Sequence, residues 1–183
     1  MNKELKKIAE ITLNLLSKKS WNTLSLKEVK QKSKVKLFDR LINNKQELLN
    51  NINAYFDYCL SLQIKNLEDS NHKDIIFEIL MMRFDILQNN RKAVLSVFNS
   101  FKYKPQELIF FLPQLLDSII SIIGYAKISN RGFIGQIKIK GILIIYLSTF
   151  LVWMKDESTS LEKTMTVLDT YLNQAGKILK YLK

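Results

Sequence analysis

The chain has 183 residues, 47% of them hydrophobic, and a formal net charge of +11. This composition is sufficient for one sizeable hydrophobic core or two smaller fused cores, and it excludes the class of disordered proteins. The single cysteine, Cys59, excludes an intrachain disulfide and a metal site built from several cysteines. Because only two prolines and five glycines interrupt the chain, we predict an all-α fold of about nine helices.

The positive charge is concentrated at the start of the chain. Residues 1–36 carry ten lysines and three glutamates, a net charge of +7. Such a surplus favours a polyanionic partner, such as nucleic acid or an anionic membrane surface. The first twenty residues place charges within an apolar periodicity, which predicts an amphipathic helix ending near Lys19 and not a secretory signal. We therefore expect a cytoplasmic location.

Three short helices are predicted before the first long one. Ser25 and Glu28 have the spacing of a capping box, in which each side chain accepts a hydrogen bond from the backbone of the other residue. Asn44 and Glu47 repeat this spacing. The helices expected after the first one span residues 26–32, 36–42 and 44–68.

Longer apolar helices are predicted in the second part of the chain. The stretch 141–154 lacks charges for 14 residues, which is shorter than the roughly 18–20 residues that a bilayer span requires. We therefore predict a buried helix there and no integral membrane segment. The chain is divided into a head, residues 1–46, and a body, residues 47–183. The helices expected in the body after the one at 44–68 span residues 73–88, 91–101, 106–125, 133–154 and 160–182.

The head has the order of elements of a helix-turn-helix, in which a second helix lies in the major groove of DNA. The apolar residues expected to point inward are Leu26, Val29, Val35, Leu37 or Phe38, and Leu41 or Ile42. Cations on the outer surface would neutralise phosphates. The alternative is a solvated lysine-rich face on an ordinary three-helix cluster. The candidate DNA-binding residues are Lys27, Lys34, Lys36, Arg40 and Lys45.

The head also resembles a known family. Residues 8–35 read IAEITLNLLSKKSWNTLSLKEVKQKSKV, and residues 37–57 read LFDRLINNKQELLNNINAYFD. These stretches resemble the N-terminal domain of the tetracycline-repressor-like (TetR/AcrR) family. The resemblance implies a three-helix DNA-binding head on a helical body that binds a small ligand and dimerises through its last two helices.

The chain departs from the pattern of that family in the helix-turn-helix. Two residues fewer than usual separate Glu28 from Glu47, and Lys34 stands where members usually have glycine. Asp39 replaces an aromatic residue that approaches the DNA backbone. If the missing residues fall within the third helix, its exposed face turns by about 200°; if they fall within the turn, the helix tilts.

A second resemblance covers about residues 80–183. The stretch LMMRFDILQNNRKAVLSVF, which starts at Leu80, and the later residues Asp156, Ser158 and Thr164 are similar to the lipid-binding accessory protein family of ubiquinone biosynthesis. That family shares the tetracycline-repressor-like fold. The resemblance implies an apolar pocket that binds an isoprenoid lipid.

The body supplies candidates for a ligand pocket and for a dimer interface. Aromatic residues and methionines recur at helical spacing and can either enclose a lipid tail or pack into a solid core. The candidate pocket residues are Met81, Phe84, Phe98, Phe111, Tyr146, Phe150 and Trp153. An apolar stripe on the last helix predicts a homodimer in which two helices of each copy form a four-helix packing. The candidate interface residues are Leu161, Met165, Leu168 and Leu172.

Catalysis is not expected from this sequence. The single histidine, His72, lies in a polar turn, and Cys59 lies on an apolar helix face. We expect neither a metal nor a cofactor. The first hypothesis is a TetR-like transcriptional regulator that binds double-stranded DNA and senses a hydrophobic small molecule or lipid as a homodimer. The alternative is a non-enzymatic lipid-binding accessory protein of ubiquinone biosynthesis with a degenerate helix-turn-helix.

Overall fold

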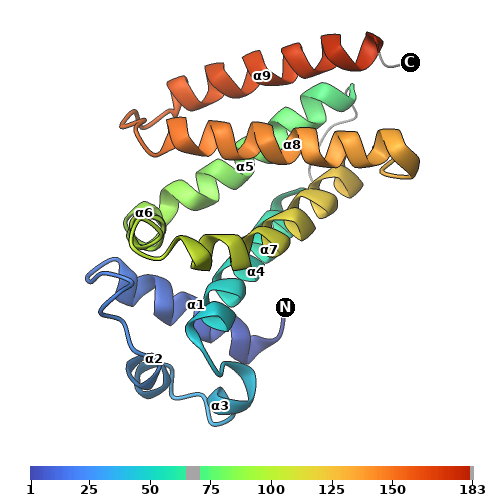
Figure 1. Ribbon diagram of the computed structural model, residues 1–183. Coiled ribbons are helices and arrows are strands. Elements are labelled where there is room, and N and C mark those ends of the chain that lie inside the picture. The colour runs from blue at the N-terminus through green and yellow to red at the C-terminus, as the bar shows by residue number, and fades with distance from the viewer. Residues whose placement is uncertain (65–70, 182–183) are drawn as a thin grey trace. The chain divides into compact units, whose positions relative to one another are not determined.

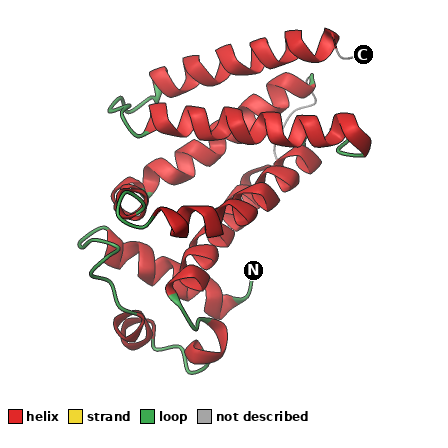
Figure 2. Cartoon of the chain, in the orientation of Figure 1, coloured by secondary structure: helices red, strands yellow, loops and turns green. Residues whose placement is uncertain are grey.

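The computed structural model describes residues 1–64 and 71–181, and these residues form helices and no strand (Figure 1, Figure 2). The prediction of an all-α fold is therefore confirmed. The ends predicted at residues 68 and 182 lie outside the described residues. The helices are α1 (Lys3–Leu16), α2 (Leu26–Ser33), α3 (Phe38–Leu41), α4 (Lys45–Gln63), α5 (His72–Asn89), α6 (Arg91–Ser100), α7 (Pro105–Tyr125), α8 (Gly132–Trp153) and α9 (Glu162–Tyr181).

The chain forms two compact units. The first unit comprises Met1–Leu62 and Asp85–Gln114, and the second comprises Gln63–Phe84 and Leu115–Lys183. The first unit thus contains the predicted head together with most of α4, the end of α5, α6 and the first part of α7. Helix α7 passes from the first unit to the second after Gln114, the residue that follows Pro113, which has no N–H to donate within the helix.

The core of the head is built by apolar residues of α1, α2 and α3. Val29 is buried, and the alternatives left open in the sequence resolve to Phe38 and Ile42. Leu37 is 45% exposed because it precedes the first residue of α3 and points away from that core. The head therefore buries one side chain of each pair and leaves Leu37 in solvent.

The capping prediction at α2 is half confirmed. The Ser25 hydroxyl accepts a hydrogen bond from the Glu28 N–H at 3.2 Å. The Glu28 carboxylate does not complete a capping box, because both of its oxygens bind the Lys19 ammonium at 2.7 Å. At α4 the Asn44 side chain accepts from the Glu47 N–H at 2.8 Å, as predicted. Both helix starts are thus fixed by side chains of the expected residues.

In the second unit, α8 and α9 lie side by side and run in opposite directions (Figure 1). Their connection is held by Asp156, which is fully buried. Its carboxylate accepts hydrogen bonds from the N–H and hydroxyl groups of Ser158 and Thr164, at 3.2, 2.6, 2.9 and 2.8 Å. Burial acts to raise the pKa of Asp156, but these hydrogen bonds outweigh it and lower the pKa to about 2.

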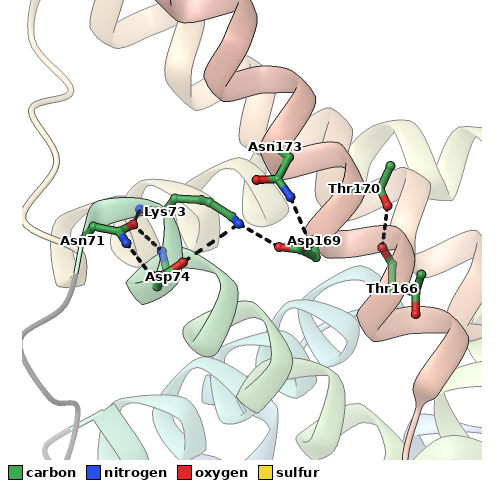
Figure 3. Close-up of polar contacts among 7 residues, drawn as sticks. All are labelled: Asn71, Lys73, Asp74, Thr166, Asp169, Thr170 and Asn173. Atoms are coloured by element: carbon green, nitrogen blue, oxygen red, sulfur yellow. Dashed lines mark hydrogen bonds and ion pairs between the residues drawn. The ribbon is translucent and has the colours of Figure 1, made fainter.

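The start of α5 is fastened to α9 within the same unit (Figure 3). The Asn71 side chain accepts hydrogen bonds from the N–H groups of Lys73 and Asp74 at 3.1 Å and so caps α5. The Lys73 ammonium lies 2.8 Å from the Asp169 carboxylate, which also accepts from the Asn173 amide at 2.9 Å. An ion pair thus joins the start of α5 to the middle of α9.

Helices α7 and α8 are each long and apolar enough to cross a membrane, judged by length and composition, and 28% of each apolar segment is buried. The stretch 141–154 is buried on one face only. Tyr146 and Trp153 face the interior, whereas Ile144 and Leu151 are exposed. The prediction of a buried helix is therefore confirmed for one face and wrong for the other, because apolar content does not reveal whether a face is covered. The absence of an integral membrane segment stays a prediction.

Candidate nucleic-acid interface

The turn between α2 and α3 has an unusual backbone at Lys34. This residue ends α2 with φ 53° and ψ 30°, and its N–H donates to the Lys30 carbonyl oxygen at 3.1 Å. A left-handed conformation costs a residue with a Cβ atom about 1–2 kcal/mol, which is why glycine is common at such positions. Lys34 therefore takes a left-handed conformation at the position where members of the resembled family usually have glycine. It places a lysine side chain at the turn.

Helix α3 is a single turn, Phe38–Leu41, and is shorter than the predicted span of 36–42. Within it Phe38 is buried, while Asp39 and Arg40 are exposed. A helix of four residues offers few side chains to the edges of bases. Any base reading by α3 therefore depends on Arg40, whose guanidinium matches the acceptors of guanine in the major groove.

Asp39 does not present an uncompensated negative charge. Its carboxylate forms an ion pair with the Lys30 ammonium of α2. The two residues border a depression of about 320 Å³ between α2 and α3, which is lined by Leu26, Lys27, Lys30, Phe38, Asp39, Ile42 and Asn43. This ion pair would offset the repulsion between the Asp39 carboxylate and a DNA phosphate, and it engages Lys30 as well.

Four of the five candidate DNA-binding residues are exposed cations: Lys27, Lys34, Lys36 and Arg40. Within the described ranges, no ion pair involves any of these four. They fall within α2, the turn and α3, so a short segment presents four cations to solvent. This arrangement suits contacts with phosphate groups.

Lys45 is placed differently from the other four candidates. Its ammonium donates to the Trp21 carbonyl oxygen at 2.7 Å and lies 5.3 Å from the centre of the Trp21 ring. Burial, and then repulsion by Lys104, lower the pKa of Lys45, whereas Glu107 raises it. The Lys45 ammonium therefore stabilises the head through its contacts with Trp21.

Trp21 also connects the head to two later helices of the first unit. Its backbone N–H donates to the Ser96 hydroxyl of α6 at 2.8 Å, and its indole N–H donates to the Glu107 carboxylate of α7 at 3.4 Å. The sequence does not predict these partners of Trp21. No local pattern links a residue to partners 75 and 86 positions away.

The candidate pocket residues fall into both units. Phe84, Tyr146, Phe150 and Trp153 form a row of rings in the second unit, with neighbouring centres 5.5, 6.5 and 5.2 Å apart. The buried Arg83 donates to the Tyr146 hydroxyl at 3.2 Å. Because the rings pack on one another, a ligand among them would have to displace ring contacts. Of the remaining candidates, Met81 lies in the second unit, and Phe98 and Phe111 lie in the first.

All four candidate interface residues belong to the second unit, and three of them are buried in its core. Leu161, Leu168 and Leu172 are buried within the chain, and only Met165 is accessible, with 41% of its surface exposed. The apolar stripe of α9 therefore packs into the hydrophobic core of its own chain. A stripe in the sequence does not distinguish packing within a chain from packing between chains.

Comparisons with known proteins identify the fold. No protein-family model and no curated protein matches the chain. Among solved structures, a TetR transcriptional regulator from Nitrosomonas europaea ATCC 19718 is similar, with a TM-score of 0.75 and 20% sequence identity. The similarity covers 96% of this chain and 99% of that chain. The chain therefore has a tetracycline-repressor-like fold, whereas the resemblance to the ubiquinone family gains no support.

Proposed function

We propose that the chain is a cytoplasmic transcriptional regulator that binds double-stranded DNA as a homodimer and responds to a hydrophobic small molecule or lipid. The observation that carries this proposal is the set of exposed cations in α2, the turn and α3. The likeness of fold to a TetR regulator over nearly the whole chain supports it.

In this proposal the head binds DNA mainly through phosphates. Lys27, Lys34 and Lys36 would each release condensed counterions on contact with a phosphate. Arg40 would contribute contacts with bases from the short α3. With so few base contacts per head, sequence specificity would also depend on two heads reading two half-sites about 34–36 Å apart.

The ligand response would reach the head through α6 and α7. The hydrogen bonds from Trp21 to Ser96 and Glu107 link the head to both helices. A ligand that binds better to one arrangement of α6 and α7 would shift the population of head positions. The aromatic residues of the body suit a hydrophobic ligand, which would bind among Phe84, Tyr146 and their neighbours.

For dimerisation we propose a role for the exposed apolar residues of α8 and α9. Ile144, Leu151 and Met165 are accessible to a second copy. Leu161, Leu168 and Leu172 would act indirectly, because they hold α9 against the core. Burial of an apolar face between two copies would stabilise the dimer.

The alternative function remains a lipid-binding accessory protein without a DNA-reading role. The observation that favours it is the single turn of α3, which leaves little surface for base reading. Under this alternative the lysines of the head would give only weak attraction to any polyanion, and the chain would carry a bound lipid after purification.

Fluorescence anisotropy with a duplex selected from random-sequence DNA, compared with unselected duplexes across a salt series, tests the proposal. A regulator is expected to bind its selected site at least about 10³-fold more tightly than random DNA. Weak binding without sequence preference that disappears at physiological salt would contradict it. Native mass spectrometry that finds a bound lipid in that case would support the alternative.

A further inference from the structure

The connection between α7 and α8 exposes apolar side chains that the proposed function does not use. We call residues 125–140 the α7–α8 tip; it lies entirely within the second unit. Phe133 is 79% exposed, and Tyr125 and Ile134 are also exposed. Several large apolar side chains exposed within one short segment favour a partner that covers them.

The α7–α8 tip is also strongly basic. It contains Lys127, Arg131, Lys138 and Lys140, and the sequence has no aspartate or glutamate between Asp117 and Asp156. Arg131 and Lys140 are exposed. The tip therefore combines apolar side chains with one sign of charge.

The backbone of the tip holds these side chains in place. Gly132 takes a φ of 66°, directly before Phe133. A Cβ atom on Gly135 would lie 2.1 Å from the carbonyl carbon of Asn130, so the loop packs closely on the start of α8. The Gly135 N–H donates to the Arg131 carbonyl oxygen at 3.2 Å, and the His72 Nδ1 lies 3.2 Å from the Ala126 carbonyl oxygen. The loop before Phe133 thus packs closely on the start of α8, and the Phe133 side chain is exposed.

We propose that the α7–α8 tip docks on an anionic membrane surface. Phe133 and Ile134 would enter the boundary between head groups and acyl chains with their apolar side chains, and Tyr125 would place its ring there with its hydroxyl towards water. Arg131 and Lys140 would bind lipid phosphates from the side, with their aliphatic stems along the apolar residues. This surface is distinct from the cations of the head and does not depend on DNA binding.

Other occupants fit the tip less well. A second copy placed tip to tip would bring cations of the same sign together, without carboxylates on the tip to pair them. Single-stranded nucleic acid would stack on aromatic rings, but the aliphatic Ile134 offers no such surface. A lipid surface satisfies both the charge and the apolar side chains.

A tryptophan probe at the tip tests where the chain meets the membrane. We expect the emission of the Phe133→Trp variant to move to shorter wavelength with vesicles of phosphatidylcholine and phosphatidylglycerol in a 7:3 ratio, and not with phosphatidylcholine alone. The unsubstituted chain gives the baseline, because Trp21 and Trp153 are buried. The matched control is Phe110→Trp in the first unit, whose parent side chain is 67% exposed. Equal shifts for both variants, or no shift at Phe133→Trp, would overturn the proposal.

Vesicle sedimentation with the full chain separates the tip from the basic head. Phe133→Ser is expected to lower partitioning about tenfold, since it removes an apolar group from the interface. Arg131→Gln with Lys140→Gln is expected to lower it about fivefold per cation. The controls are Phe110→Ser and Lys27→Gln with Lys36→Gln. If only the head variant reduces partitioning, or if all tip variants partition like the parent chain, the membrane contact does not lie at the tip.

Discussion

Among the described residues, Lys34, Lys127 and Leu161 have a Cβ atom and a left-handed conformation, and the surroundings of Lys34 and Leu161 differ. Lys34, between α2 and α3, has φ 53°, and Leu161, before α9, has φ 54°. The Leu161 side chain is buried, so hydrophobic burial offsets the strain of its backbone. The Lys34 side chain is exposed, so no burial of that side chain offsets the strain of its backbone. The α8–α9 connection is thus stabilised by burial of Leu161, whereas the α2–α3 turn keeps a strained, charged residue that suits contact with a partner.

The largest expected effect lies at the α8–α9 connection. Asp156→Ala would leave the N–H and hydroxyl groups of Thr164 and Ser158 without their acceptor, so we expect a loss of about 3 kcal/mol in the free energy of unfolding. Urea denaturation followed by circular dichroism measures it. Ser158→Ala should cost about 1 kcal/mol. A loss below that value for Asp156→Ala would show that the carboxylate does not hold the connection.

The same carboxylate predicts how stability depends on pH. The pKa of Asp156 is lowered from 3.8 to about 2 in the folded chain, so the unfolded chain binds this proton first as the pH falls. The contribution is fully present above about pH 4 and is lost as the pH falls towards 2. Asp156→Asn should remove this part of the pH dependence, as measured by melting temperature between pH 5 and pH 2. An unchanged profile would contradict the assignment.

Glycine substitutions at Lys34 and Leu161 test whether side-chain burial offsets the strain of the left-handed backbone. Leu161→Gly relieves the backbone but removes a buried side chain, and we expect a net loss of about 2 kcal/mol. Lys34→Gly relieves the backbone without loss of packing and should stabilise the chain by about 0.5–1 kcal/mol. Thermal unfolding of both variants gives the two signs. If both variants lose stability, contacts of the Lys34 residue offset the strain of its backbone, and the proposed difference between the two turns is wrong.

The smallest expected effect concerns the ion pair between Lys30 and Asp39. Asp39→Asn would release Lys30 to bind phosphate, so we expect DNA affinity to rise about threefold at low salt. Anisotropy with a fixed duplex measures the change. The double variant Lys30→Met with Asp39→Asn should return affinity to about the parent value. An increase that persists in the double variant would have another cause.

The sequence allowed the helices and much of the head to be predicted, because these depend on local signals. Ser25 at the start of α2 and Val29 in the core follow from capping and from periodicity. The choice between Leu37 and Phe38 required the first residue of α3, which the sequence pattern placed at residue 36 and the structure places at Phe38. The partners of Trp21, the pairing of Lys30 with Asp39, and the burial of Leu168 depend on tertiary packing. Apolar stripes and exposed lysines look alike in sequence whether or not the chain itself provides their partners.

The central claim is that the cations of α2, the turn and α3 bind DNA phosphates. The most direct test is the salt dependence of affinity for one duplex, compared between the parent chain and the variant Lys27→Gln, Lys34→Gln, Lys36→Gln, Arg40→Gln. Each lost phosphate contact should reduce the slope of log affinity against log salt by about 0.9, so we expect a reduction of about 3 or more. Lys45→Gln, which removes the contacts of the Lys45 ammonium with Trp21, should leave the slope unchanged. Equal slopes and affinities for the parent chain and the fourfold variant would contradict the claim.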